Sequence, residues 1–519
     1  MKKLLQSFVC ILTIVAILCT TACGTAVMEN ATFGDVRSEY NTSLDLSENT
    51  YTENNAPSDY YQLLEFEDAT LGGSCKVTSN ELFSGGAGVT GLNSDSDSMV
   101  LSFEIENSGF YNLTVSSLTS SAGRTNYANL DGSYIGSVEN EVANEVCDVT
   151  LEYIYLSADT HEFSMTVSWG WVDYDCLVIT ASDINIEDVY NVTCSLSNEN
   201  ADDNTVRLYN FLCDIYGKYT LTGQFADASR DSEEYEWITS ITGEEFAVLG
   251  LDMMNYTPVA QANNATTETV ERAYDWYVNC GGIVQICWHW QSPEGCVSDN
   301  GEWYSSFYTE YSTIDLDKAM NGEDEELYNL LVEDMHEIAS KLQILRDYGV
   351  PVLWRPLHEA SGAWFWWGDC SAESYIALYR LMYEIFTEEY ELTNLIWVWN
   401  GQDADWYPGD DVVDIIAWDI YPGENEYSSQ AATFIEAYRC SDETKLVALS
   451  ENGCIPDPDN LQQDNIHWLY WGVWSGDFVY TWKGYNESYT EESMLIKAYE
   501  SDYTLTLDEL PDLTKYRLS

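Results

Sequence analysis

The sequence predicts a multidomain protein in which an N-terminal β-sandwich is followed by a (β/α)8 TIM barrel. Short alternating runs of apolar and polar residues fill positions 60–182, separated by Gly, Asn and Ser clusters, which is typical of sandwich strands. From about residue 204 onward, short apolar runs alternate with stretches of helical periodicity. This alternation favours parallel strands covered by helices, and a chain of 519 residues is long enough for both folds.

The N-terminus reads as an export signal followed by a tether. In residues 1–23, two lysines precede an apolar run that ends in small residues, and the ending TTACG predicts a lipoprotein-type signal with a lipid on Cys23. An ordinary cleaved signal is the alternative, because Thr20 stands where such sites usually carry Leu. Residues 24–57 are polar and acidic, as in a flexible linker. We therefore expect a secreted, extracellular or cell-surface protein that meets the membrane only through a lipid at Cys23.

Within the sandwich region, the predicted strands include MVLSFEI, YNLTVSSL, VTLEYIYL, EFSMTVSW and CLVIT. The segment 183–203 ends in SNENADDN and is predicted to be a second linker or, alternatively, a docking segment. The barrel domain is then expected over residues 204–519.

Eight short apolar runs in this last region are candidates for barrel strands, because strands buried on both faces read as continuous apolar stretches. Helical patterns lie between them, and the clearest one repeats Leu, Met and Ile every three or four positions from Leu327 to Leu345. The eight candidate strands are 219–224, 246–253, 282–290, 350–357, 395–400, 413–421, 445–451 and 477–482.

The charge balance excludes some classes of partner. Twenty basic residues against 88 acidic ones give a formal charge of -68. This charge repels phosphate backbones and polyanionic polymers, so we expect no nucleic-acid partner, whereas a neutral polymer is unaffected. The simpler interpretation of the charge is solubility outside the cell.

The predicted barrel places the candidate chemistry at one rim, because active sites of this fold lie at the C-terminal ends of the strands. Glu359 follows the fourth strand and Glu451 ends the seventh. Two carboxylates on one rim are what glycosidic bond cleavage needs: one protonates the leaving oxygen, and the other attacks the anomeric carbon or activates water. The remaining rim candidates are Trp288, His289, Trp290, Arg355, His358, Asp419, Tyr421 and Trp482.

Each of these residues also has an ordinary structural interpretation. A single Glu at a strand end is often a helix cap or a solvated residue, and the SENG sequence around Glu451 fits a plain turn. His289 between two Trp residues fits a buried core histidine, and Trp482 fits a core position.

The motif WRPLHEASGAWFWWG, with ICWHWQSP, WDIYPG and ALSENG in the same order, resembles glycoside hydrolase family 26 over about residues 204–510. The resemblance implies a retaining barrel enzyme, mainly of the endo-β-1,4-mannanase type, with Glu359 as general acid/base and Glu451 as nucleophile. No cofactor is expected for catalysis. The resemblance also implies that His289 contacts the sugar, Arg355 orients the carboxylates, His358 positions the acid/base, Trp364 stacks on the leaving side, Asp419 supports the site, Tyr421 bonds the nucleophile and Trp482 forms the floor.

The N-terminal region resembles carbohydrate-binding module family 35 in its motifs LLEFEDATLGG, GFYNLTV, NLDGSYIGSV and VDYDCLVI. This resemblance implies a structural calcium ion held by Glu65, Glu67 and Asp175, since carboxylate oxygens suit calcium. Trp169 and Trp171 are candidates for stacking on sugar rings, or alternatively for packing the sandwich.

We therefore expect a secreted, monomeric endo-β-1,4-mannanase with a sugar-binding module, acting on a β-mannan-type polysaccharide by double displacement. A mixed-linkage β-1,3-1,4-glucanase or a β-1,3-xylanase on the same scaffold is the alternative. A catalytically dead, glycan-binding surface lipoprotein is a third hypothesis, and it predicts the loss of a carboxylate that this chain retains.

Overall fold

The computed structural model describes residues 44–47, 51–226, 228–296 and 302–518. The predicted signal, Cys23 and much of the predicted tether lie outside the described residues. No helix in the described part is long and apolar enough to cross a membrane.

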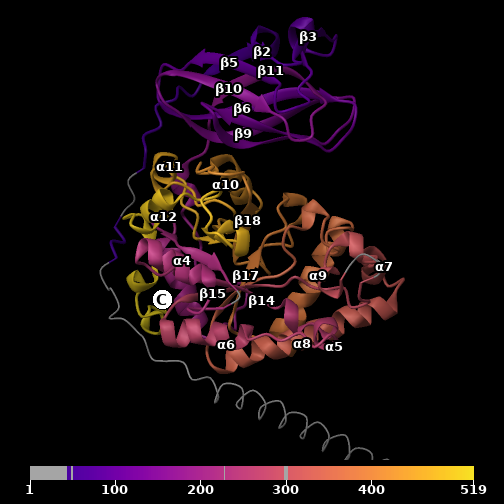
Figure 1. The fold of residues 1–519 in the computed structure, drawn as a ribbon, viewed down its shortest axis with the longest axis vertical. Helices are drawn as coiled ribbons and strands as arrows, with labels where there is room; N and C mark the ends of the chain where they lie inside the picture. The colour runs from indigo at the N-terminus through magenta and orange to yellow at the C-terminus, as the bar shows by residue number, and fades with distance from the viewer. Residues whose placement is uncertain (1–43, 48–50, 227, 297–301, 519) are drawn as a thin grey trace, which may run out of the picture.

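The N-terminal region forms two antiparallel sheets, drawn in indigo and purple in Figure 1. Burial alternates along their strands: in Ser98–Glu104, Met99, Leu101 and Phe103 point into the core. This alternation confirms the predicted β-sandwich. One sheet contains β1 (Tyr61–Glu65), β3 (Lys76–Ser79), β4 (Ala87–Thr90), β6 (Gly109–Thr119), β9 (Val146–Leu156) and β11 (Val172–Ala181), and the other β2 (Thr70–Gly72), β5 (Ser98–Glu104), β7 (Arg124–Leu130), β8 (Ser133–Asn140) and β10 (Thr160–Thr166).

The second region is a closed barrel of eight parallel strands, as predicted. The strands are short and buried, and the first pairs with the last through Gln224 and Val473. They are β13 (Gly223–Phe225), β14 (Val248–Asp252), β15 (Ile283–Cys287), β16 (Val352–Arg355), β17 (Leu395–Trp399), β18 (Ile415–Ile420), β19 (Leu446–Asn452) and β20 (Trp471–Val473).

The prediction for the eighth strand was wrong. The barrel closes with Trp471–Val473, while the predicted segment 477–482 lies in the loop that follows. That loop folds into a small hairpin of β21 (Tyr480–Thr481) and β22 (Gly484–Tyr485). Both segments carry aromatic and β-branched residues, and the true strand has only three residues, so the sequence pattern favoured the hairpin.

The first predicted strand contained two separate strands. β12 (Thr220–Leu221) pairs with β23 (Thr504–Leu505) outside the barrel. The barrel strand β13 begins two residues later. The first barrel strand therefore ends at Phe225, which faces the site described below.

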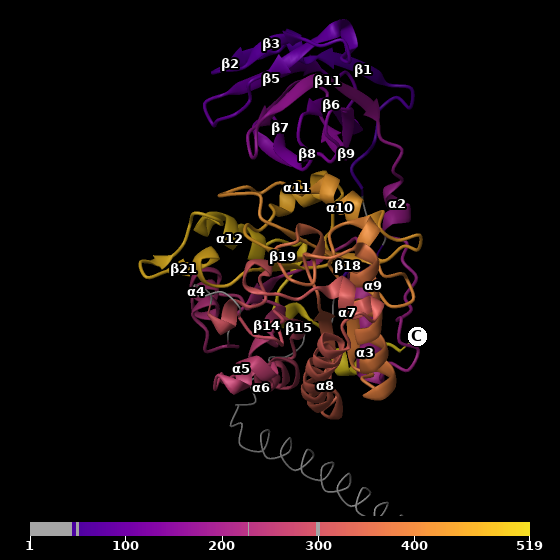
Figure 2. The ribbon, with the colours of Figure 1, turned by 90° about the vertical axis from the view of Figure 1, so that its right-hand side faces the viewer.

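Helices cover the barrel (Figures 1 and 2). α8 buries Leu327, Leu331, Met335 and the rest of the predicted apolar stripe, and the Asp324 carboxylate caps its N-terminus. The helices are α2 (Ile186–Val189), α3 (Asp203–Ile215), α4 (Glu233–Thr242), α5 (Pro258–Ala262), α6 (Thr269–Tyr274), α7 (Leu316–Asn321), α8 (Glu325–Asp347), α9 (Ala372–Glu384), α10 (Ala431–Tyr438), α11 (Pro458–Gln463) and α12 (Glu492–Tyr499).

The sandwich packs on the barrel beside α10 (Figure 2). Phe110 and Tyr153 of the sandwich belong to the same apolar cluster as the barrel core. Arg439, at the end of α10, pairs with Glu152 of β9 at 2.7 Å. The two regions therefore share a buried contact.

Candidate active site

Arg355 lies at the centre of the rim, at the end of β16. Its side chain is fully buried, and it donates to Asp419 at 2.6 Å and to Glu451 at 2.5 Å. A buried guanidinium is tolerated when it is paired and hydrogen-bonded, because pairing offsets the cost of its dehydration. Arg355 thus connects strands β16, β18 and β19 at the sequence positions predicted for the site.

Two residues that sequence reasoning missed complete the bonding of Asp419. Asn400, directly after β17, donates to Asp419 at 2.9 Å, and the Ser450 hydroxyl donates to the same oxygen at 2.8 Å. Asn400 lies in no motif singled out in the sequence, and Ser450 lies in ALSENG, where only Glu451 carried a predicted role, so the folded arrangement identifies both. The network holds the Asp419 carboxylate between neighbouring strands.

The two predicted catalytic carboxylates face each other across the rim. One carboxylate oxygen from each of Glu359, Asp419 and Glu451 lies within 4.8 Å of the others. Burial, with the charges of Asp419 and Glu451, raises the pKa of Glu359 well above its usual value. The Tyr421 hydroxyl donates to Glu451, which therefore accepts bonds from two side chains. The environment of Glu359 therefore favours its protonated form, whereas Glu451 is held as a hydrogen-bond acceptor.

The main chain at the tip of β16 is in an unusual conformation. Leu357 and Glu359 have φ values of 53° and 54°, in the left-handed region that non-glycine residues seldom occupy. The Glu359 N–H donates to the Asn400 carbonyl at 2.7 Å, which helps to hold this turn. Such backbone strain, roughly 1–3 kcal/mol for each residue, is concentrated at functional sites.

Only the first of the four consecutive aromatic residues faces solvent. Trp364 is 45% exposed, and its indole N–H donates to Glu359 at 2.8 Å. Phe365, Trp366 and Trp367 are buried, and the Trp367 indole bonds the His358 carbonyl at 2.8 Å. Three rings therefore support the turn, while one stands beside the acid.

Two histidines lie side by side next to this turn. His289, after β15, and His358 face each other with their Nε2 atoms 3.3 Å apart. His289 also bonds the Asp252 carboxylate at 2.6 Å. Asp252 ends β14 and was not predicted as a site residue. The structure brings His289, His358 and Glu359 together.

Trp482 does not lie at the end of a barrel strand, because it occupies the turn of the hairpin β21–β22. It is 91% exposed, and Lys483 lies over its ring. Trp474, which follows β20, takes the rim position instead. Its ring lies 4.8 Å from Phe225 and 5.6 Å from His289, between ring centroids. The misplaced eighth strand is why the sequence placed Trp482 at a strand end.

In the sandwich, two of the three predicted calcium ligands, Glu65 and Asp175, converge on the turn at Ser84. The Ser84 hydroxyl bonds Glu65 at 2.6 Å and Asp175 at 3.1 Å. Glu67 has a buried carboxylate oxygen without a partner among the described residues, and burial raises its pKa. Glu65 and Asp175 lie, with Cys176, in a group whose possible ligand atoms are within 4.8 Å of one another, and Glu67 is not part of that group. The carboxylate oxygens fit the donors that calcium prefers, while the thiol does not.

Trp169 and Trp171 stand in solvent, 66% and 65% exposed. The Arg124 guanidinium lies over both rings, 5.5 and 4.8 Å from their centroids. Neither ring packs the sandwich core. The pair forms an exposed aromatic surface of the kind that stacks on flat apolar faces.

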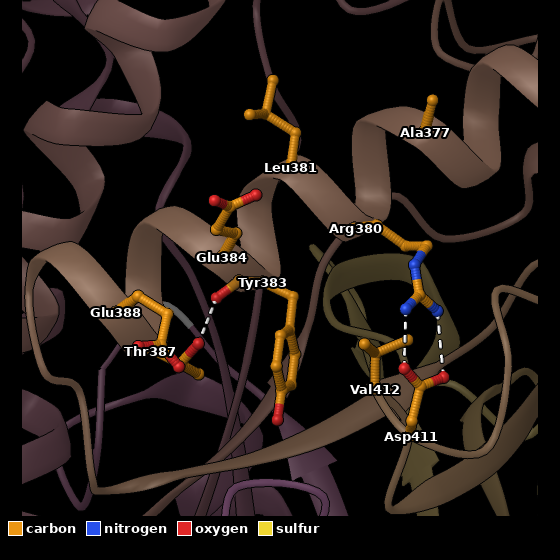
Figure 3. Close-up of a pocket in the computed structure, with 9 residues that line it drawn as sticks. All are labelled: Ala377, Arg380, Leu381, Tyr383, Glu384, Thr387, Glu388, Asp411 and Val412. Atoms are coloured by element: carbon orange, nitrogen blue, oxygen red, sulfur yellow. Dashed lines mark hydrogen bonds and ion pairs between the residues drawn. The ribbon is translucent and has the colours of Figure 1, made fainter.

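A surface cavity of about 400 Å³ opens beside α9, away from the rim (Figure 3). Arg380 and Asp411 pair across one side of it at 2.6 Å. Its lining holds no cluster of catalytic groups, so the chemistry lies with the carboxylates at the rim.

Comparisons with known proteins identify the family of each region. Residues 197–509 match the model of glycosyl hydrolase family 26, and residues 62–182 match that of carbohydrate binding module family 35. A mannan endo-1,4-β-mannosidase of Thermothelomyces thermophilus is 35% identical over 456 residues, covering 88% of this chain and 91% of that protein. Mannan endo-1,4-β-mannosidase B of a Piromyces species is 28% identical over 435 residues, covering 83% and 73%.

Solved structures give the same result. The GH26-CBM35 β-(1,4)-mannanase of Podospora anserina is 32% identical, with a TM-score of 0.60, over 88% of this chain and all (100%) of that one. A β-mannanase from a symbiotic protist of the termite Reticulitermes speratus, crystallised with a gluco-manno-oligosaccharide, is 30% identical with a TM-score of 0.55. The match covers 62% of this chain and 98% of the chain of that mannanase.

Proposed function

The chain belongs to glycosyl hydrolase family 26, and from that premise we propose that it is an exported, retaining endo-β-1,4-mannanase. Its substrates would be the internal β-mannosidic bonds of mannan, galactomannan and glucomannan. The observation that supports the mechanism best is the pair Glu359 and Glu451, whose carboxylate oxygens lie within 4.8 Å. This upper limit is shorter than the separation of about 6.5–9.5 Å in inverting enzymes, and so favours the retaining arrangement.

In the first step, a Glu451 oxygen attacks the anomeric carbon and forms a glycosyl ester. The bond to the leaving sugar breaks, and Glu359 transfers its proton to the departing oxygen. The raised pKa of Glu359 favours the protonated form that this step needs.

In the second step, Glu359, now a carboxylate, removes a proton from water. The water oxygen attacks the anomeric carbon, the ester bond to Glu451 breaks, and Glu359 holds its proton again. One water molecule is added across the bond, with the β configuration kept.

The neighbouring side chains support these steps. Arg355 and Tyr421 orient Glu451 through the bonds described above. Trp364 stands beside Glu359 and would stack under the leaving sugar. Trp474 takes the floor role expected of Trp482, because its ring lies between Phe225 and His289 at the rim.

The sandwich would bind the same polymer through Trp169 and Trp171. Glu65, Glu67 and Asp175 would hold a calcium ion, whose charge would fix the turn at Ser84. We further propose that the enzyme is a monomer attached to the cell surface by a lipid at Cys23.

The test is reducing-sugar release from mannan, galactomannan, barley β-glucan and β-1,3-xylan in parallel. We expect release from the mannans above all, with the β anomer appearing first in ¹H NMR spectra of the products. Activity on β-glucan or β-1,3-xylan without activity on mannan would favour the alternative enzymes. An α anomer formed first would contradict the retaining mechanism.

A further inference from the structure

Three polar side chains from neighbouring strands form a row that ends beside the acid. Asp252 ends β14, His289 follows β15, and His358 follows β16 directly before Glu359. The Asp252 carboxylate lies 2.6 Å from Nδ1 of His289, and Nε2 of His289 lies 3.3 Å from Nε2 of His358. His289 is 9% exposed and His358 is 1% exposed, so water does not determine their bonding.

Asp252 is fixed through both of its oxygens. Oδ1 accepts the backbone N–H of His289 at 3.1 Å and that of Met254 at 2.8 Å. Oδ2 is therefore left to face Nδ1 of His289. Because an ionised carboxylate only accepts hydrogen bonds, Nδ1 must carry the hydrogen.

The order of donors then follows along the row. A His289 ring with a single hydrogen, on Nδ1, offers a lone pair at Nε2, and His358 then donates from its own Nε2. His358 stays neutral, because burial and the charge of Arg355 lower its pKa well below the usual value. Its Nδ1 has no partner among the described residues, so no acceptor there holds the hydrogen away from Nε2. The Cys287 sulfur also lies near His289 Nδ1, but at 4.0 Å, whereas the Asp252 carboxylate lies at 2.6 Å, so the carboxylate is the stronger partner of that nitrogen.

We propose that Asp252 is a positioning residue, which sets the donor–acceptor order of the His289–His358 pair beside the acid/base. The catalytic part of this inference rests on the proposed function. His358 lies between Leu357 and Glu359, both in the left-handed region, so the bond to its ring helps to hold the turn that presents the acid. Neutral His358 also places no positive charge next to Glu359, whose protonated form the first step needs.

Asp252→Asn reverses the order without changing the size of the side chain. The two backbone N–H groups hold the amide oxygen, so the amide nitrogen faces Nδ1 of His289 and requires a lone pair there. His289 then carries its hydrogen on Nε2, and His358 moves its hydrogen to Nδ1. ¹⁵N NMR of protein labelled in histidine reports each tautomer, and the chain has only five histidines.

We expect both tautomers to exchange in Asp252→Asn, and kcat on mannan to fall about 10- to 100-fold with little change in KM. Asp252→Glu keeps the carboxylate, so it should keep hydrogen on Nδ1 of His289 and recover part of kcat. Asp131→Asn is the matched control, because Asp131 bonds Nδ1 of His161 at 2.7 Å on the sandwich. That change should leave His289, His358 and kcat as they are.

Three results would overturn the proposal: a doubly protonated His289 in the native enzyme, unchanged tautomers in Asp252→Asn, or exchanged tautomers with native kcat. The tautomers are read without substrate. If the native enzyme fails to cleave mannan, the proposed function falls, while the hydrogen-bond order is still decided by the spectra.

Discussion

At the barrel rim the charged side chains are buried and bonded to one another, whereas on the sandwich two aromatic rings stand in solvent with one guanidinium over them. Arg355 is inaccessible and its two carboxylate partners are nearly so. Trp169 and Trp171 expose about two thirds of their surface, at 66% and 65%. Both regions are expected to meet the same polymer.

The difference reflects what each region must do. Bond cleavage needs carboxylates fixed in position and in protonation state, and burial among fixed partners provides both. Binding a polymer needs only flat apolar area, which exposed rings provide without burying charge. We therefore expect changes at the rim to cost activity steeply, and changes on the sandwich to cost affinity gradually.

The largest effect should come from the two glutamates. Glu359→Ala and Glu451→Ala should each lower kcat on mannan by at least about 10⁴-fold, while polymer binding persists. A dinitrophenyl β-glycoside separates their roles, because its leaving group needs no proton. Glu359→Ala should still form the glycosyl ester rapidly with this substrate, and Glu451→Ala should not. Mannan hydrolysis at the native rate in either variant would contradict the assignment.

Asp419→Asn should lower kcat about 10- to 100-fold and also change the pH profile, because it removes one of two partners of a buried Arg. Burial raises the pKa of Glu359 most, and the Asp419 charge raises it further. Loss of that charge lowers this pKa, so Glu359 loses its proton at a lower pH, and the alkaline limb of kcat/KM moves to lower pH.

The control for this change is Asp411→Asn, which breaks an exposed pair with Arg380 beside the outer cavity (Figure 3). An exposed pair contributes about 0–1 kcal/mol to stability. We therefore expect no change in kcat or in the pH of the alkaline limb of kcat/KM. If the alkaline limb of kcat/KM moved to higher pH in Asp419→Asn, the charge of Asp419 would not be what raises the pKa of Glu359.

Replacing the two tryptophans after the last barrel strand, Trp474 and Trp482, should have smaller effects on kcat/KM. Trp474→Ala removes a ring that contacts Phe225 and His289, so we expect about a 10-fold loss of kcat/KM on mannohexaose, as one stacking partner is lost. Trp482→Ala removes a ring that is 91% exposed, and less than about a 2-fold change should follow. The reverse ranking would restore Trp482 as the floor of the site.

This pair of tryptophans also shows how far the sequence could lead. The WRPLHE segment predicted the tip of β16, because its charges and aromatics are unusual at the end of a buried strand, and the periodicity from Leu327 to Leu345 predicted α8. The eighth strand has three residues, too few for a period to show, so the sequence expected Trp482 rather than Trp474 directly after a barrel strand.

Residues that act through contacts distant in sequence were missed for another reason. Asp252 lies 37 positions from the histidine that it bonds, and Asn400 lies 19 positions from Asp419. A single Asp or Asn after a strand carries no local sign of such a partner. Only the closed barrel places these groups together.

The smallest effect should come from the sandwich. Trp169→Ala and Trp171→Ala should each weaken adsorption to insoluble mannan about 5- to 10-fold, the loss expected for a stacking contact of roughly 1–1.4 kcal/mol. Neither should change kcat on mannohexaose, because the rings lie outside the buried network at the rim. Tyr61→Ala is the matched control: Tyr61 is 64% exposed on the same module, at the other end of β11, and its loss should leave adsorption unchanged. Equal losses in all three variants would mean that exposed aromatic area, rather than the surface under Arg124, determines binding. An unchanged adsorption in both tryptophan variants would place the polymer elsewhere on the sandwich.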